Sequence, residues 1–218
     1  MPDDPAAALP DPHRTTATRM LVIRHGQTTW GAEGKFAGRE DVPLTPRGRR
    51  QASSAAQRLR RLAPVAVLTS PLQRCRLTAE AIAGAVDAEV LVRDELLDGT
   101  LGQWTGFTAE EIENRWPAEF TAWRSDPGAT PPGGESFTAI RERVQPLLVE
   151  VLRRYRGRTV VLVTHAATAK MILAWALDAP SEVAYRVRID TASLTGISVD
   201  DAGRTMVWAV NETGHLPD

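Results

Sequence analysis

The sequence lacks the features that mark secreted, membrane-spanning or nucleic-acid-binding proteins. Cys75 is the only cysteine among 218 residues, so no internal disulfide can form. No apolar run approaches the roughly 20 residues that a membrane-spanning helix needs. The formal net charge of -1 gives no overall field that would recruit nucleic acid or an anionic membrane. We therefore expect a cytoplasmic protein that acts without a membrane or a nucleic-acid partner.

The first residues also lack a recognisable targeting signal. Residues 1–18 are rich in Ala, Pro and Asp, with neither the basic start nor the apolar stretch of a signal peptide. This composition predicts a disordered tail or linker at 1–18. The remaining residues, 19–218, are numerous enough for one domain with a sizeable core.

Apolar segments of strand length alternate with helical patterns along most of the chain. This alternation predicts an α/β fold, a three-layer α/β/α sandwich with a mostly parallel central sheet. Inserted segments such as 109–124 predict a small cap over the carboxyl edge of that sheet. Strands are expected at 20–23, 65–69, 89–92, 160–163, 192–199 and 205–210, and the main helices at 45–62, from 70 onward, at 136–155 and at 167–177.

The most informative segment is Arg24-His25-Gly26-Gln27-Thr28, which follows the short apolar strand at 20–23. A buried parallel strand delivers the residues after it to the carboxyl edge of the sheet, where open α/β sheets bind ligands. The glycine is expected to let backbone N–H groups approach an anion. The segment therefore indicates a pocket for a phosphoryl group with a nucleophilic histidine at its floor.

Two further segments place cationic or imidazole side chains after predicted strands. Arg74 follows the strand at 65–69, and His165 follows the strand at 160–163. Arginine supplies the planar set of donors that a phosphomonoester dianion requires. The sequence contains no HExxH, paired-cysteine or acidic-loop pattern, so we expect neither a metal site nor a cofactor.

These motifs occur in an order that resembles the histidine phosphatase superfamily, in the branch that includes cofactor-dependent phosphoglycerate mutase. The resemblance covers roughly residues 19–216. Two stretches, Thr130-Pro131-Pro132-Gly133-Gly134-Glu135-Ser136-Phe137 and Lys170-Met171-Ile172-Leu173, carry a closer likeness. They resemble the acid phosphatase domain of actinobacterial ribonuclease H fusions and α-ribazole phosphatases. Besides the first segment, the motifs are Gly38-Arg39, Asp41-Val42-Pro43-Leu44-Thr45, Ser70-Pro71-Leu72-Gln73-Arg74, Gly102-Gln103-Trp104, Gly133-Gly134-Glu135-Ser136 and Val163-Thr164-His165.

The resemblance implies a role for each core residue. Arg24 and Arg74 would hold the phosphoryl oxygens, and His25 would form a phosphohistidine. His165 would donate to the phosphoryl oxygens during transfer. The family normally places a glutamate four residues before the glycine of its Gly-x-Trp segment. Here that position holds Asp98, which is the candidate general acid and base, with Asp94 and Glu95 as alternatives.

Two departures from the family pattern affect the substrate contacts. Gly31 stands where many relatives have a phosphate-binding asparagine, so Gln27, Thr28 or backbone donors must replace that contact. Ala166 replaces the glycine that usually follows the second histidine. At the start of a helix alanine costs little, so the backbone donor of Ala166 is retained.

The predicted function is a metal-independent acid phosphatase that hydrolyses a small phosphorylated metabolite through phosphohistidine. One alternative is a mutase that returns the phosphoryl group to another hydroxyl. The compact stretch from Trp104 to Gly134 favours hydrolysis over the mutase reaction. A second alternative is a non-catalytic module that binds a phosphorylated ligand. The physiological substrate is left open, as is the formation of a homodimer.

Overall fold

The computed structural model describes residues 17–217, so most of the predicted tail lies outside the described residues. Ala17 is buried, and Thr18 is the first residue of strand β1. The folded region therefore begins just before residue 19. Within residues 17–217, no helix combines the length and the apolar character that crossing a membrane demands.

Six strands form one sheet in the order β3-β2-β4-β1-β5-β6. The strands β1 to β4 are mutually parallel where they pair, and β5 and β6 form an antiparallel hairpin beside β1. The sheet is thus mostly parallel, as predicted. The bounds are Thr18–Arg24 (β1), Ala66–Thr69 (β2), Glu89–Val92 (β3), Thr159–Thr164 (β4), Leu194–Val199 (β5) and Thr205–Glu212 (β6).

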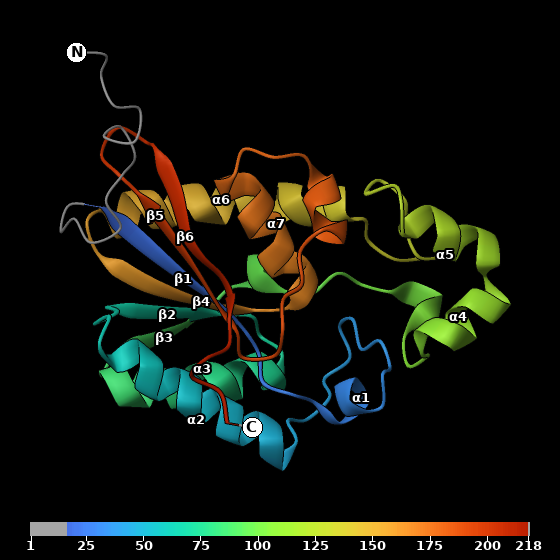
Figure 1. The fold of residues 1–218 in the computed structure, drawn as a ribbon, viewed down its shortest axis with the longest axis horizontal. Coiled ribbons are helices and arrows are strands. Elements are labelled where there is room, and N and C mark those ends of the chain that lie inside the picture. Colours follow the sequence, from blue (N-terminus) through green and yellow to red (C-terminus); the bar gives the residue numbers. More distant parts are fainter. Residues whose placement is uncertain (1–16, 218) are drawn as a thin grey trace.

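Helices cover both faces of the sheet, which confirms the three-layer arrangement (Figure 1). The pair α2 and α3 packs on one face, and the pair α6 and α7 packs on the other. Short 3₁₀ turns occupy 94–96, 102–104 and 181–185. The helices are α1 (Thr29–Ala32), α2 (Pro46–Arg60), α3 (Gln73–Val86), α4 (Ala109–Arg115), α5 (Pro117–Trp123), α6 (Phe137–Arg154) and α7 (Ala166–Ala176).

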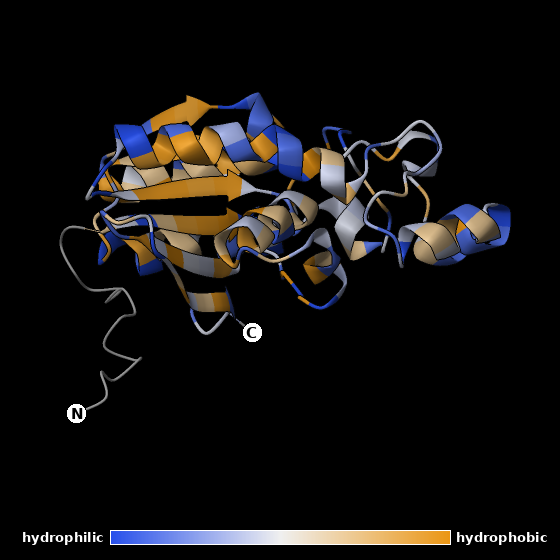
Figure 2. Ribbon diagram, turned by 90° about the horizontal axis from the view of Figure 1, so that it is seen from above, coloured by the Kyte–Doolittle hydropathy of each residue, from blue (hydrophilic) through white to orange (hydrophobic). Residues whose placement is uncertain are grey.

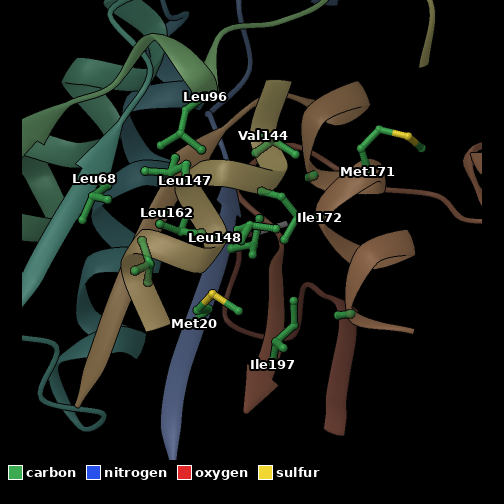
Figure 3. Close-up of a cluster of buried hydrophobic side chains, with 14 of the residues drawn as sticks. Met20, Leu68, Leu96, Val144, Leu147, Leu148, Leu162, Met171, Ile172 and Ile197 are labelled. Carbon is green, nitrogen blue, oxygen red and sulfur yellow. The ribbon is translucent and has the colours of Figure 1, made fainter. Parts of the chain in front are cut away.

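The hydrophobic core has two halves, because successive side chains of each strand point to opposite faces of the sheet. Met20 and Val22 of β1 face the layer of α6 and α7, whereas Leu21 and Ile23 face α2 and α3. The central strands are buried on both sides and read as continuous apolar runs, coloured as hydrophobic in Figure 2. Figure 3 shows the cluster on the side of α6 and α7. This double burial fixes the register of β1, because a slip of one residue would exchange its two faces.

The cap predicted over the carboxyl edge consists of α4, α5 and the loops around them. Figure 1 shows these two helices beyond the carboxyl ends of the parallel strands. A capping box begins α4, since Thr108 and Glu111 exchange side-chain and backbone hydrogen bonds. A separate apolar cluster around Trp104, Ile112 and Phe120 holds the cap together.

The helix predicted from residue 70 onward begins later than expected. Helix α3 starts at Gln73, and its N-cap is Leu72. Ser70 remains at the end of β2, where its hydroxyl contacts His165. Ser70 therefore follows the predicted strand, but it is not the start of the helix.

Candidate active site

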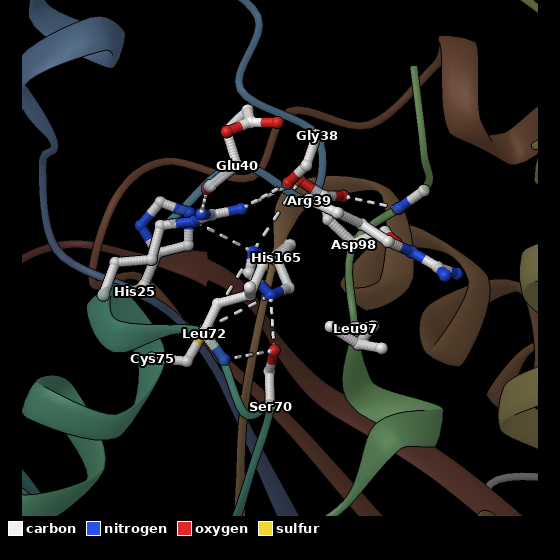
Figure 4. Close-up of polar contacts among 12 residues, drawn as sticks. His25, Gly38, Arg39, Glu40, Ser70, Leu72, Cys75, Leu97, Asp98 and His165 are labelled. Carbon is white, nitrogen blue, oxygen red and sulfur yellow. Dashed lines mark hydrogen bonds and ion pairs between the residues drawn. The ribbon is translucent and has the colours of Figure 1, made fainter. Parts of the chain in front are cut away.

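The carboxyl ends of three adjacent strands bring four side chains together, the histidine–arginine cluster of Arg24, His25, Arg74 and His165. Strand β4 lies between β1 and β2, so residues that follow these three strands share one sheet edge. The imidazoles of His25 and His165 lie 5.2 Å apart between ring centroids, edge to face. Figure 4 shows His25, His165 and Asp98 facing a common space.

His25 is held as a neutral imidazole with one free nitrogen. Its Nδ1 lies 2.8 Å from the carbonyl oxygen of Gly26, which can only accept, so Nδ1 carries the proton and donates. Nε2 has no hydrogen-bond partner within residues 17–217 and keeps its lone pair. Burial, with the positive charges of Arg74 and Arg24, holds the pKa of His25 well below its usual value.

His165 is fully buried, and its partners fix the opposite tautomer. The Nε–H of Arg74 points at His165 Nδ1, 3.3 Å away, so Nδ1 must accept. Nε2 then carries the proton and donates to Ser70 Oγ at 2.9 Å. Burial is the largest cause that lowers the pKa of His165, followed by the charge of Arg74. His165 thus supports the cluster from behind, because it is not among the residues that line the cavity.

The two arginines are held differently by the surrounding chain. Arg74 is buried and donates to the carbonyl oxygens of Gly38 and Glu40, each at 2.6 Å. Arg24 donates from one terminal nitrogen to Ile189 O at 2.7 Å, but its buried Nε has no partner within the described chain. A buried donor without an acceptor is costly, and an oxygen of a bound anion would satisfy it.

Asp98 reaches this cluster from the loop after β3. Its Oδ2 lies 3.7 Å from a terminal nitrogen of Arg74 and 3.7 Å from His165 Nδ1. Its Oδ1 accepts from the backbone N–H of Gly99. Burial raises the pKa of Asp98 despite the opposing charge of Arg74. The alternatives are placed elsewhere, since Asp94 is exposed and Glu95 pairs with Arg93 at 3.1 Å.

A cavity of about 250 Å³ opens in front of the cluster. Arg24, His25, Arg74 and Asp98 contribute to its lining. The opposite wall is aromatic, because Trp123 stacks on Phe137 with ring centroids 5.7 Å apart and also contacts Phe36. The cavity therefore combines a strongly polar floor with an apolar wall of the kind that holds an organic group.

The structure brings only some of the other predicted contact residues to the cavity. Thr28 lines it, as does Ala166 in the first turn of α7, where backbone N–H groups lack partners within the helix. Gln27 is not among the lining residues. Its side-chain oxygen accepts from Thr45 Oγ1 at 2.9 Å, so Gln27 fixes the start of α2 rather than facing the cavity.

The predicted role of Gly26 needs correction. Its N–H does not face an anion site but donates to Thr78 Oγ1. A side chain at Gly26 would collide with the backbone of Gly48, and one at Gly48 would collide with Gln27. The glycine is thus required by close packing of the loop against the first turn of α2.

Sequence reasoning missed two groups that contact the predicted residues. Ser70 holds His165, and its position at a strand end of the same sheet edge was the signal available. Arg143 lies three residues after the buried Ile140 of α6, on the same side of the helix, and an arginine on that apolar side is a second signal. Cys75 is buried against His165, as expected of a core residue, and burial raises the pKa of its thiol. No group of metal-binding side chains occurs within residues 17–217.

Comparison with known proteins places this geometry in a family. The sequence profile described as "Histidine phosphatase superfamily (branch 1)" matches residues 20–212. The chain is 40% identical over 204 residues to the bifunctional protein Rv2228c of Mycobacterium tuberculosis, covering 93% of this chain and 56% of that protein. This chain thus spans about half the length of that relative.

Two other relatives are matched over almost their whole length. Phosphoserine phosphatase 1 of Hydrogenobacter thermophilus is 31% identical over 199 residues, 91% of this chain and 94% of that protein. A solved structure of a mycobacterial glucosyl-3-phosphoglycerate phosphatase with VO3 superposes with a TM-score of 0.84 at 30% identity, covering 89% of this chain and 99% of that one. Since the profile spans nearly all described residues and these relatives share the fold, the chain belongs to the histidine phosphatase superfamily, branch 1.

Proposed function

We propose that this chain is an acid phosphatase that hydrolyses a small phosphomonoester through a phosphohistidine intermediate on His25. The observation that carries the proposal is the state of His25. Its imidazole is neutral, its Nδ1 is committed to Gly26 O, and its Nε2 is free beside Arg24 and Arg74. An imidazole with a lone pair directed at a cationic pocket is equipped to attack phosphorus.

The reaction follows from these groups in two balanced steps. In the first, the lone pair of His25 Nε2 forms a bond to phosphorus, and the bond from phosphorus to the ester oxygen breaks. That oxygen takes the proton of Asp98 and leaves as the alcohol. In the second, Asp98 takes a proton from water as the water oxygen attacks phosphorus. The bond between phosphorus and nitrogen breaks, and inorganic phosphate leaves.

The cationic side chains stabilise the transferring group. We assign Arg24 and Arg74 to its non-bridging oxygens, since the orphaned Nε of Arg24 lacks only an acceptor. Arg74 and Ser70 occupy both nitrogens of His165, so donation by His165 to the phosphoryl oxygens would require the Arg74 contact to rearrange. That donation stays a prediction from the family resemblance.

Hydrolysis is favoured over the two alternatives. The two relatives described above, at 31% and 30% identity, are named phosphatases, for phosphoserine and for glucosyl-3-phosphoglycerate, whereas a Salmonella relative at 28% identity is named a probable phosphoglycerate mutase. Trapping a radiolabelled protein with an alkaline quench, with and without an added hydroxyl acceptor, tests this directly. A label whose lifetime depends on the acceptor would favour a mutase. Vanadate binding without any turnover would favour a non-catalytic module.

The aromatic wall indicates a substrate with an organic group beyond the phosphate. Phe36, Trp123 and Phe137 supply that wall, and we propose a small phosphorylated metabolite as the substrate class. The narrower likenesses to ribonuclease H fusion domains and to α-ribazole phosphatases stay predictions. So do a cytoplasmic location and a homodimer.

The reaction should be favoured at mildly acidic pH. Asp98 must be protonated to release an alkoxide, so kcat/KM for an alkyl phosphate should fall as pH rises through its raised pKa. The lowered pKa of His25 keeps this imidazole neutral in acid, so the nucleophile is not lost there. Measuring kcat/KM between about pH 4 and pH 9 checks this. An activity that rises steadily to the alkaline end contradicts the assignment of Asp98.

Removal of divalent metals should leave turnover unchanged. The guanidinium groups of Arg24 and Arg74 provide the positive charge and the donors that a metal ion would otherwise supply to the phosphoryl group. Activity after dialysis against EDTA, measured with and without added Mg²⁺ or Zn²⁺, gives the comparison. A loss on dialysis that the metal restores would exclude this mechanism.

A further inference from the structure

Side-chain donors bind the backbone carbonyl groups of the loop that carries Asp98. Arg143 of α6 donates from one terminal nitrogen to Glu95 O at 2.8 Å and to Leu97 O at 3.2 Å. Its other terminal nitrogen lies 3.5 Å from Asp98 O. One guanidinium therefore holds three carbonyl oxygens of the four-residue segment 95–98, which ends at the proposed acid.

Glu135 fixes that guanidinium in turn. Its two carboxylate oxygens accept from Nε and from a terminal nitrogen of Arg143, each at 3.1 Å. This is the paired geometry in which an arginine and a carboxylate hold each other most firmly. The side chains of Arg143 and Glu135 are 20% and 15% exposed, so water competes little for these contacts.

Other side chains hold the same segment from different directions. Arg39 donates to Asp98 O at 3.2 Å and also pairs with Glu135. Thr164 and Thr168 donate to Leu96 O and Leu97 O, each at 2.7 Å. Every carbonyl from Glu95 to Asp98 thus has a side-chain donor, an unusual density for a surface loop.

These hydrogen bonds to the backbone matter because the side chain of Asp98 is short. An aspartate is one methylene shorter than the glutamate usual in the family, and its Oδ2 nevertheless lies 3.7 Å from both Arg74 and His165. A shorter side chain can reach the reacting oxygen only if its backbone is held closer to the cluster. Misplacement of an acid by about 1 Å can cost roughly 100-fold in rate.

We propose that Arg143, locked by Glu135, is a positioning residue that holds the backbone of Asp98 close enough for its short carboxyl to protonate the leaving group. The proposal rests on the proposed function. Arg143 is not among the residues that line the cavity, and it contacts the Asp98 loop through backbone carbonyl groups. Its charge also lowers the pKa of Asp98, an effect that Arg143→Lys retains.

The test compares Arg143→Met with the wild type on two substrates, an alkyl phosphate and p-nitrophenyl phosphate. The alkyl group is a poor leaving group and needs an acid, whereas p-nitrophenolate leaves without one. Because kcat/KM reports the steps up to departure of the leaving group, it isolates this requirement. We expect kcat/KM for the alkyl phosphate to fall roughly 10-fold to 100-fold, with little change for p-nitrophenyl phosphate.

Two control variants separate position from folding and from charge. Arg141→Met removes an arginine of the same helix that donates to Ala179 O, and it should change neither substrate. Arg143→Lys keeps the charge but cannot span three carbonyls and Glu135, so it should show the same selective loss. If Arg143→Met does not fold, Arg143→Lys alone tests the positioning role.

A double-mutant cycle that combines Arg143→Lys with Asp98→Asn completes the experiment. In the Asp98→Asn background, Arg143→Lys should cost nothing further, because the group that it positions is already gone. Equal loss on both substrates, full rescue by lysine, or additive losses in the double variant would each overturn the proposal. A wild-type protein that hydrolyses neither substrate would instead overturn the proposed function.

Discussion

Replacing His25 with alanine is expected to lower turnover of any phosphomonoester by about 10⁴-fold or more. The change removes the nitrogen that forms the covalent intermediate, and no other described side chain offers a free lone pair at that place. His165 cannot substitute, because Arg74 and Ser70 occupy both of its nitrogens. Steady-state assays give the rate, and labelling with a radioactive phosphomonoester followed by an alkaline quench gives the intermediate.

The matched control is His215→Ala. His215 is a half-buried histidine whose Nε2 contacts Ala192 O, and it is not among the residues that line the cavity in front of His25. Its replacement should leave both turnover and labelling intact. If the His25→Ala protein keeps a tenth of the wild-type rate, or still becomes labelled, the nucleophile has been assigned to the wrong residue.

The second large effect is expected for Asp98→Asn. The amide keeps the size of the side chain and the contact with Gly99 N–H, but it can neither donate a carboxylic proton nor accept one from water. Hydrolysis of an alkyl phosphate should therefore fall by roughly 10²-fold to 10⁴-fold. Binding of inorganic phosphate should persist, because the arginines that hold the anion are unchanged. Inhibition constants for phosphate, measured beside kcat, separate the two properties.

Asp94→Asn serves as the comparison for this variant. Asp94 is exposed, and its carboxylate is not among the groups that line the cavity. It should retain full turnover and the wild-type pH profile. A large loss in the Asp94 variant, with normal activity in the Asp98 variant, would transfer the acid role to the other residue.

Much of the fold could be predicted because its signals are local. The apolar runs of β1 and β4 identify strands buried on both faces, and Thr45-Pro46 marks the first residue of α2. The order of Arg24, His25, Arg74 and His165 relative to the strand ends also predicts that they meet. A single sheet edge requires this once the strands are parallel.

What could not be predicted depends on contacts between distant segments. The backbone of Gly26 packs on Gly48, and no local pattern reveals that partner. The side-chain oxygen of Gln27 accepts from Thr45 Oγ1, a residue 18 positions along the chain, and Gln27 does not line the cavity. The tautomer of His165 is set by Ser70 and Arg74, which only the folded chain brings to its two nitrogens. The sequence thus predicted which residues reach the sheet edge, but not where their side chains point.

The facing glycines 26 and 48 have a mechanical consequence. Without side chains between them, the turn that bears the nucleophile and the first turn of α2 touch backbone to backbone, with no compressible layer to absorb a displacement. Any side chain larger than a hydrogen at either position would wedge these two backbones apart. It would therefore shift the turn that follows His25 away from α2, and with it the aim of the nucleophilic nitrogen.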